Sequence, residues 1–152
     1  MPQPVYREAR YADAPAIVEF QIAMAHETEG VTLDSNTCAL GVNAVFADPS
    51  KGRYFVAEVD NTPVASTMIT YEWSDWRNGL VWWIQSVYVK PEFRRKGVYA
   101  GLYDHIKAIV EGDQDLRGVR LYVDTRNINA QQVYARLGMN GDHYRVFEWM
   151  KS

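Results

Sequence analysis

The chain has 152 residues, a formal net charge of −3 and an apolar fraction of 47%. A chain of this length can bury its own core without a metal or a disulfide, so we expect one domain covering residues 1–152. The balance of apolar and charged residues excludes disordered, collagen-like and coiled-coil proteins. The single cysteine, Cys38, excludes an intrachain disulfide and a cysteine metal cluster, and it favours a reducing, cytoplasmic setting.

The composition also disfavours several kinds of partner. Lys and Arg are dispersed except at residues 94–96, and the chain is mildly acidic, so we expect no nucleic-acid partner. The opening residues contain an early acid, and no apolar run approaches a membrane span, so we expect neither a signal peptide nor a membrane partner. His26 and Glu27 begin an H-E pair, but no second histidine follows at zinc-hydrolase spacing, so we expect no metal.

The first third of the chain predicts a strand and two helices. Residues 6–10 form a short strand pattern, and a helix with apolar residues at helical spacing begins near Asp13. Asp34 or the residue after it can cap a second helix, which Pro49 ends. Residues 26–34 between the helices are polar and contain a glycine, so we expect a loop there.

The rest of the chain alternates between strands and helices. Extended apolar runs bounded by turn residues predict strands at residues 53–60, 64–72, 80–89, 118–125 and 144–150. Apolar residues at three- and four-residue spacing predict helices at residues 97–112 and 129–137. Because the first of these helices would connect two parallel strands, we expect an α/β fold with helices packed on a mixed sheet.

Three cations, Arg94, Arg95 and Lys96, lie in the stretch RRKGVYAG between an expected strand and an expected helix. A helix that begins near Gly97 presents unpaired backbone N–H groups at its positive end, and this geometry binds phosphate. The cations can add charge-assisted hydrogen bonds. The alternative is a solvated basic turn. No G-x-x-x-x-G-K-[ST] or G-x-G-x-x-G pattern is present, which excludes the common nucleoside triphosphatases and dinucleotide-dependent oxidoreductases.

The run V-Y-V-K-P-E-F-R-R-K-G-V-Y-A at residues 87–100 resembles the signature of the GNAT superfamily of N-acetyltransferases. In that family the pattern [Q/R]-x-x-G-x-[G/A] binds the pyrophosphate of acetyl-CoA. Arg94 and Gly97 match its first and fourth positions, whereas Tyr99 stands at the sixth. A second stretch is similar to the family pattern N-x-x-A-x-x-x-Y-x-x-x-G-F, at Asn127, Ala130, Tyr134, Gly138 and Met139.

The resemblance implies an α+β, GNAT-like fold and acetyl-CoA as cofactor. The implied sheet is mixed and mostly antiparallel, with six to seven strands, about four flanking helices and central parallel strands that splay apart. The pantetheine arm of acetyl-CoA would lie in the gap and pair with exposed strand backbone. The residues implied in cofactor binding are Val87, Tyr88, Val89, Arg94, Arg95, Lys96, Gly97, Val98, Tyr99, Ala100, Asn127 and Tyr134.

The same resemblance implies a catalytic role for Tyr134. An amine that attacks a thioester expels a thiolate, and a phenol with a pKa of about 10 can protonate it while staying neutral at pH 7. The alternative for Tyr134 is a core aromatic on a helix face. We expect direct transfer of the acetyl group to a primary amine in a ternary complex. Because Cys38 lies away from both motifs in the sequence, we expect no acetyl-cysteine intermediate.

The acceptor pocket is expected between the loops at residues 26–34 and 72–79. The substrate-binding candidates are His26, Glu29, Glu72 and Trp82, with Tyr71, Trp73 and Trp76 as further walls. Acidic residues in these loops would suit a cationic acceptor, such as a polyamine, an amino sugar, a protein lysine or a protein N-terminus, and scattered surface acids are the alternative. His26, Glu29, Glu72 and Asp124 are alternatives for the general base.

Two other functions compete with acetyl transfer. One is a non-catalytic acyl-CoA-binding or sensor protein of the same fold, and the other is a phosphate-binding module for nucleotides or RNA. Aromatic residues such as Trp149 are consistent with a homodimer.

Overall fold

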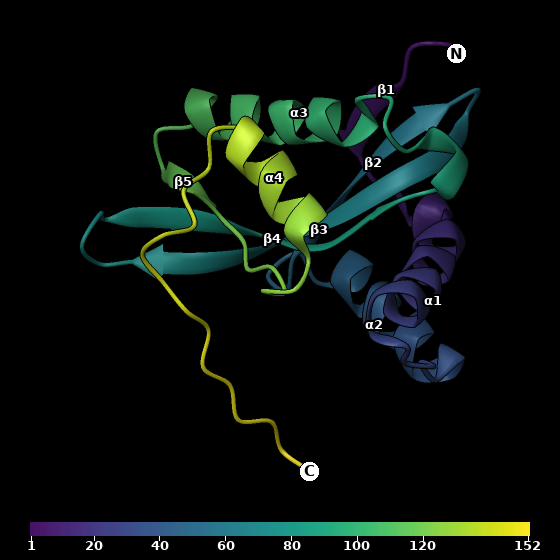
Figure 1. Cartoon of the computed structure of the whole chain (residues 1–152), viewed down its shortest axis with the longest axis horizontal. Helices are drawn as coiled ribbons and strands as arrows, with labels where there is room; N and C mark the ends of the chain where they lie inside the picture. The colour runs from purple at the N-terminus through teal and green to yellow at the C-terminus, as the bar shows by residue number, and fades with distance from the viewer. The chain divides into compact units, whose positions relative to one another are not determined.

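The structure is a computed structural model that describes residues 1–152 (Figure 1). The chain separates into two compact units, Met1–Arg120 and Leu121–Ser152. That the whole chain forms one domain stays a prediction. No helix is long and apolar enough to cross a membrane.

The first unit is built on a five-stranded sheet with the order β1-β2-β3-β4-β5. The first four strands form an antiparallel meander: β1 (Val5–Glu8), β2 (Arg53–Val59), β3 (Thr62–Ser74) and β4 (Gly79–Val89). Strand β5 (Leu116–Arg120) then joins β4 in parallel, after the crossover helix α3 (Val98–Gly112). The expected mixed, mostly antiparallel sheet is therefore confirmed.

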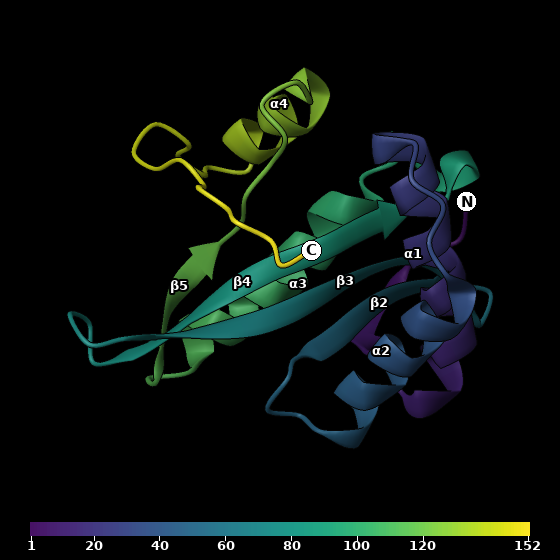
Figure 2. The ribbon, with the colours of Figure 1, turned by 90° about the horizontal axis from the view of Figure 1, so that it is seen from below.

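Helices cover both faces of this sheet. Helix α3 lies on one face, and α1 (Ala14–Glu29) and α2 (Ser35–Ala47) lie on the other (Figures 1 and 2). Helix α3 buries Val98, Leu102, Ile106 and Val110, which recur every four residues and form one apolar stripe. Helix α1 buries Ile17 and Phe20 in the same way. Helix α4 (Ile128–Arg136) belongs to the second unit and brings the helices to the expected four.

The expected loop at residues 26–34 is partly wrong, because α1 continues through Glu29. The helix ends at Gly30, whose φ of 64° is left-handed and whose N–H donates to the His26 carbonyl at 3.1 Å. Glycine adopts this conformation without a Cβ clash and is therefore common just after the last residue of a helix. The position of Gly30 predicts the end of α1 better than the polar composition of residues 26–34 does. Helix α2 begins as predicted, since the Asp34 carboxylate accepts the Thr37 N–H at 2.9 Å.

The expected strand count of six to seven is too high by at least one. Residues 144–150 are not a strand, and their aromatic side chains are exposed. Strand β5 ends at Arg120, so the expected strand at residues 118–125 is shorter and begins earlier. A strand exists only where a neighbour accepts its backbone hydrogen bonds, and no strand pairs with residues 144–150.

Arg7 on β1 ties the start of α1 to the sheet. Its guanidinium donates to both carboxylate oxygens of Asp13, at 2.8 and 3.1 Å, and to Glu58 at 3.0 Å. Asp13, which is 6% exposed, also accepts the Arg10 backbone N–H at 2.7 Å. Burial alone would raise the pKa of Asp13, but the hydrogen bonds from Arg7 and Arg10 more than offset it and lower the pKa below its ordinary value.

We expect Asp13→Asn to lower the free energy of unfolding by about 2–3 kcal/mol at pH 7, because the partly buried Arg7 charge loses its closest anion. Since the pKa of Asp13 is depressed by folding, its stabilisation is present above about pH 4 and is lost as the pH falls further. Urea unfolding at several pH values between about 3 and 7 should therefore show a shallower acid dependence for the variant.

The matched control is Glu8→Gln, which removes the more exposed ion pair with Arg53. It should change stability by less than about 1 kcal/mol. Equal acid dependence in the wild type and in Asp13→Asn would contradict the role assigned to Asp13.

Candidate functional site

The candidate site begins at a bulge in β4. Ser66 of β3 faces Tyr88, whereas Met68 faces Gln85, so β4 contains one extra residue between these pairs. Ser86 lies in this bulge with a φ of 55°. The Thr67 hydroxyl donates to the Gln85 carbonyl at 2.9 Å and holds the distorted segment against β3. A bulge of this kind bends the strand and redirects its side chains.

The parallel pairing of β4 with β5 stops just before the bulge. The ladder runs from Leu80 to Trp83 of β4, so residues 84–89 pair with β3 but not with β5. The Lys90 N–H donates to the Val64 carbonyl, and antiparallel alternation therefore turns the backbone groups of Val87 and Val89 away from β3. These backbone groups point to the side of β4 on which β5 lies, but β5 ends before it reaches them.

The turn after β4 leads to the positive end of α3. Arg95 and Gly97 have left-handed φ values of 62° and 77°. Gly97 is the N-cap of α3, and no side chain caps this helix. The first turn, which contains Val98, Tyr99 and Ala100, directs its backbone N–H groups out of a fifteen-residue helix. This end of α3 is therefore suited to an anionic ligand.

The three cations of this turn differ in what they contact. Arg94 Nε donates to the Val89 carbonyl at 2.8 Å, and its Nη2 donates to Glu27 of α1 at 2.7 Å. The Arg94 guanidinium also lies 5.4 Å from the ring of Tyr88. Arg95 and Lys96 are exposed. Arg94 therefore holds the turn to β4 and α1, while Arg95 and Lys96 supply the solvent-facing positive charge.

Gly101 lets the first two turns of α3 pack against β1. A Cβ at this position would collide with the hydroxyl and ring of Tyr6. The phenol of Tyr6 has a raised pKa because of burial and the nearby Asp104, so it is neutral at physiological pH. This contact fixes how the start of α3 sits on the sheet.

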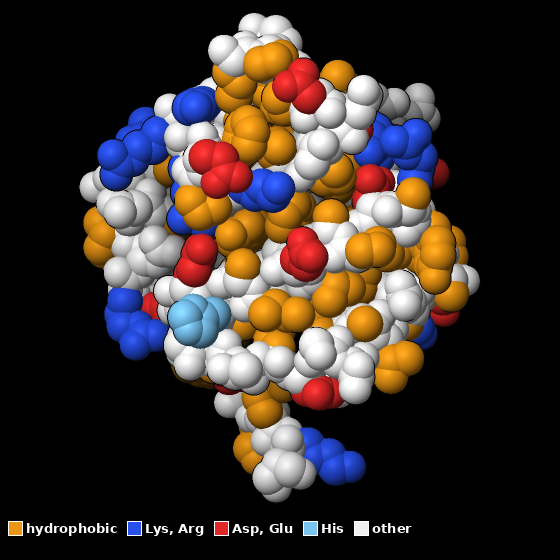
Figure 3. Space-filling model, turned by 90° about the vertical axis from the view of Figure 1, so that its right-hand side faces the viewer, with side chains coloured by type: hydrophobic (Ala, Val, Ile, Leu, Met, Phe, Trp, Pro, Cys, Tyr) orange, Lys and Arg blue, Asp and Glu red, His pale blue; other side chains and the backbone are white.

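A pocket of about 410 Å³ opens beside the bulge on the α1 and α2 side of the sheet. Its volume is in the range of small-molecule sites. It is lined by Gln21, Leu33, Asp34, Thr37, Cys38, Gly41, Val42, Val45, Tyr54, Met68 and Ser86. Figure 3 faces the side on which α1 and α2 lie, and in its middle apolar side chains alternate with backbone and polar groups, with a carboxylate among them.

The ionisable groups of this pocket are neutral or already engaged. Burial raises the pKa of the Cys38 thiol, and it raises the pKa of Tyr54 to about 12. The Asp34 carboxylate accepts both the N–H and the hydroxyl of Thr37, at 2.9 and 2.6 Å. Gln21 is 8% exposed, and its Nε2 has no hydrogen-bond partner.

Of the substrate-binding candidates from the sequence, none lines this pocket. His26 and Glu29 lie at the exposed end of α1. Trp82 is buried, with the Arg53 guanidinium 5.1 Å from its ring. Glu72 accepts Trp83 Nε1 at 2.7 Å and Arg120 Nη1 at 2.9 Å.

The carboxylates suggested as general bases include two that are held as anions. The hydrogen bond from Trp83, together with Arg120, lowers the pKa of Glu72. Hydrogen bonds from Arg126 lower the pKa of Asp124 to about 2. A lowered pKa makes a carboxylate a weaker base, so Glu72 and Asp124 are poorly suited to take a proton from an ammonium. No group of His, Cys, Asp or Glu side chains is placed to hold a metal ion.

The second sequence motif lies on α4 in the second unit. Asn127 caps this helix, since its side-chain oxygen accepts the Ala130 N–H at 3.1 Å. Tyr134 is half-buried on the same helix. Gly138 follows the helix with a φ of 89°. The roles of Asn127 and Tyr134 toward acetyl-CoA stay predictions.

Sequence reasoning missed the polar and sulfur-containing residues that line the pocket, among them Gln21, Cys38 and Ser86. Gln21 alone carried a signal, because it occupies a helical position between apolar residues of α1. A polar side chain at such a position is a candidate for a buried binding group. Ser86 carried none, since serine seldom marks a bulge.

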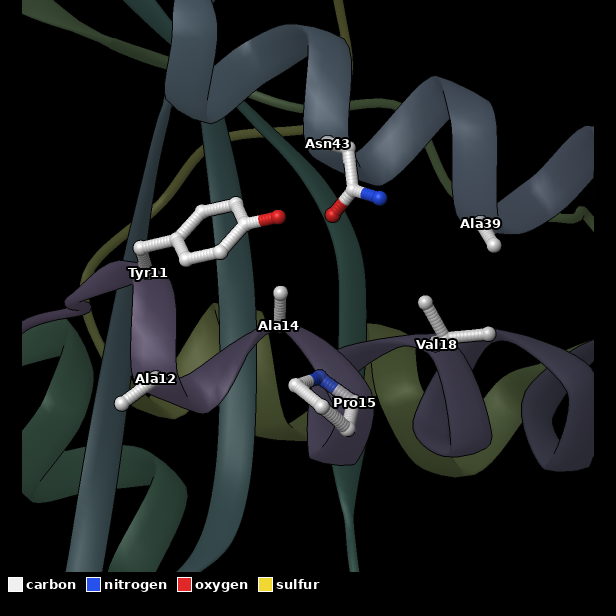
Figure 4. Close-up of a pocket in the computed structure, with 7 residues that line it drawn as sticks. All are labelled: Tyr11, Ala12, Ala14, Pro15, Val18, Ala39 and Asn43. Atoms are coloured by element: carbon white, nitrogen blue, oxygen red, sulfur yellow. The ribbon is translucent and has the colours of Figure 1, made fainter.

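A second hollow, of about 480 Å³, lies between the start of α1 and α2. Figure 4 shows the Tyr11 hydroxyl and the Asn43 amide facing each other across it. Its other lining residues are small and apolar. It contains none of the site residues expected from the sequence.

Comparisons with known proteins agree with this geometry. The sequence model of the acetyltransferase (GNAT) family matches residues 16–139. The chain is similar to a possible acetyltransferase from Clostridium difficile 630, with 44% identity, a TM-score of 0.92 and 99% of each chain covered. No functionally curated protein matches the sequence.

Two more distant solved structures share the fold. One is a predicted acetyltransferase with acetyl-CoA from Clostridium acetobutylicum, with 18% identity, a TM-score of 0.74 and 96% of each chain covered. The other is the ribosomal-protein-alanine N-acetyltransferase from Brucella melitensis biovar Abortus 2308, with 13% identity, a TM-score of 0.79, and 98% of this chain and 100% of that chain covered.

The contact between Gly101 and Tyr6 can be tested by a double-mutant cycle. We expect Gly101→Ala to lower the free energy of unfolding by about 1–3 kcal/mol, because the new methyl group overpacks the contact. Combining it with Tyr6→Leu should cost less than the sum of the two single changes. Gly112→Ala is the control, since a Cβ there meets no other atom. Strict additivity in urea unfolding would show that the two residues are not in contact.

Proposed function

The chain belongs to the acetyltransferase (GNAT) family, and on this basis we propose that it transfers an acetyl group from acetyl-CoA to a primary amine. Family membership supports acyl transfer in general. The observation that carries the finer proposal is the position of three features in one region of the first unit. They are the uncapped start of α3, the end of β4 without a β5 neighbour, and the pocket that reaches Ser86 in the bulge.

The residues of this region fit the parts of acetyl-CoA. The pyrophosphate would bind the N–H groups at the start of α3, with Arg95 and Lys96 adding charge. The pantetheine amides would pair with the backbone of Val87 and with the N–H of Val89, whose carbonyl already accepts Arg94 Nε. When bound, acetyl-CoA supplies an activated acyl group as a thioester. Asn127 is proposed to contact the amide chain of the cofactor, as the family pattern implies.

The proposed reaction is a direct displacement in a ternary complex. The amine nitrogen forms a bond to the acetyl carbon, the carbon–sulfur bond breaks, and the thiolate of coenzyme A leaves. Tyr134 gives its phenolic proton to this thiolate. The acceptor ammonium gives one proton to a base or to water before the attack. The nitrogen gives a second proton to the Tyr134 phenolate after the attack, directly or through water, so the phenol is restored. Because Glu72 and Asp124 have lowered pKa values, His26 and Glu29 are the remaining candidates for that base.

The competing function is an acyl-CoA sensor of the same fold, which would bind acetyl-CoA without turnover. The cytoplasmic setting and a homodimer also stay predictions.

The catalytic proposal is tested by Tyr134→Phe, which removes only the phenolic hydroxyl. Coenzyme A release should be measured as free thiol against a panel of amines. We expect kcat to fall at least about 100-fold, since a general acid contributes on the order of 100- to 10,000-fold.

Tyr11→Phe makes the same chemical change on an exposed residue of the other hollow and should leave turnover unchanged. Undiminished turnover in Tyr134→Phe would remove Tyr134 from the mechanism. Tight binding of acetyl-CoA without any amine-dependent release would favour the sensor.

The cofactor proposal is tested by the double variant Arg95→Ala/Lys96→Ala. Binding of coenzyme A, measured by calorimetry, should weaken by about 5- to 30-fold, because two charge-assisted contacts with phosphate are lost. Binding of pantetheine, which lacks the phosphates, should not change. Lys107→Ala removes an exposed cation farther along α3 and is the control. Equal weakening for coenzyme A and pantetheine would show that these cations do not bind phosphate.

A further inference from the structure

The pocket beside the β4 bulge contains a buried donor that nothing in the protein uses. Gln21 is 8% exposed and lines the pocket, and its Nε2 has no hydrogen-bond partner. Buried polar groups in folded proteins are nearly always paired, and an unpaired one calls for an explanation. The Nε2 atom itself is sealed from solvent, so the Gln21 amide must turn toward the pocket to reach a ligand. A ligand that brings an oxygen atom to the turned amide would provide the missing partner.

The rest of the lining offers little for a second positive charge. Four apolar side chains, Leu33, Val42, Val45 and Met68, contribute to the walls. The one carboxylate of the lining, Asp34, is engaged by Thr37 at the start of α2. Hydrogen bonds from Thr37 leave the charge of Asp34 in place, but a polyamine would bring more than one ammonium, and any ammonium among the apolar walls would lack a counter-ion, which is costly.

Two of the acidic residues that suggested a cationic acceptor are paired with arginines outside the pocket. Glu27 is paired with Arg94 at 2.7 Å, and Glu72 is paired with Arg120 at 2.9 Å. Neither of them lines the pocket. Of the acidic residues in these loops, only Asp34 lines it, and Asp34 is exposed.

We propose that the acceptor is a small monoamine with an apolar side chain and one carbonyl oxygen, and that Gln21 Nε2 donates to that oxygen. An amide of an apolar α-amino acid has this chemistry. This inference rests on the proposed acetyl transfer, and it makes Gln21 a specificity-determining residue. The amine nitrogen would point toward Ser86 in the bulge, and the apolar side chain would contact the walls formed by α2 and β3.

Specificity is tested by comparing leucinamide with 3-methylbutylamine, which has the same apolar branch but lacks the carboxamide. The ratio of their kcat/KM values should fall about tenfold in Gln21→Leu, as expected when one hydrogen bond to a substrate is removed. Because the two amines differ in basicity, only the change of this ratio between variants is interpreted. Gln114→Leu makes the same change at an exposed turn and should leave the ratio unaltered. An unchanged ratio in Gln21→Leu would overturn the inference.

A structural role for Gln21 is separated by thermal unfolding without ligand. If Gln21 serves the substrate, Gln21→Leu should unfold at the same temperature as the wild type or higher, because an unpaired buried donor is removed. A marked fall in the unfolding temperature would show that Gln21 serves the fold, and this result would also overturn the inference.

Pocket occupancy can be measured without acetyl-CoA, because the chain's single cysteine, Cys38, lines the same pocket. Burial raises the pKa of Cys38, so its reaction with an aromatic disulfide reagent should be followed at alkaline pH, above the ordinary thiol pKa of about 8.5, to populate the reactive thiolate. Leucinamide should slow this reaction in the wild type and slow it less in Gln21→Leu. Spermidine should not slow it.

The two measurements separate this inference from the proposed function. Protection of Cys38 by leucinamide without any acetyl transfer would leave the inference on the ligand in place and overturn the proposed reaction. Acetyl transfer to spermidine, with no protection by leucinamide, would support the reaction and overturn the inference.

Discussion

The constraint on which the rest of the site depends is the extra residue in β4 at Ser86. With that residue, β4 follows β5 only as far as Trp83 and then bends while still paired with β3. Beyond Trp83, where β5 ends at Arg120, the backbone groups of β4 on that side are not used by the sheet. The bulge brings Ser86 to the pocket between the sheet and the first two helices. The end of β5 and the bulge lie a few residues apart on β4, and together they shape the site.

Helix α1 connects these two halves. Near its end, Glu27 holds Arg94 and accepts the Tyr88 hydroxyl at 3.4 Å, while Phe20 stacks on Tyr88 with ring centroids 5.3 Å apart. Nearly two turns before Glu27, Gln21 lines the pocket. The start of the same helix is held by the buried ion pair between Arg7 and Asp13. The helix is therefore anchored at both ends. A shift of α1 would move both the turn that contains Arg94 and the pocket wall at Gln21.

Local signals in the sequence predicted much of this architecture. The features that they missed depend on contacts between residues that are far apart in the sequence. The cap at Asp34, the apolar stripe of α3 and the glycine at position 97 act within a few residues, so the sequence alone reveals them. The bulge at Ser86 depends on the pairing of β4 with β3. Residues 144–150 would form a strand only beside a neighbouring strand, and none pairs with them. The sequence gives no sign that Glu72 is paired, because its partner Arg120 lies 48 residues further along the chain. The position of α4 in the sequence was also predictable from a local signal, because Asn127 caps this helix.

The way Arg94 is held bears on why its family pattern admits either glutamine or arginine at that position. Both side chains present N–H groups, yet only arginine carries a charge. In this chain the Arg94 Nε donates to the Val89 carbonyl, and its charge is balanced by Glu27. What the two residue types have in common is thus the ability to satisfy a backbone oxygen where a strand turns into a helix. In this chain, the residue that satisfies the carbonyl of Val89 is therefore different from the exposed cations, Arg95 and Lys96, that are proposed above to bind phosphate.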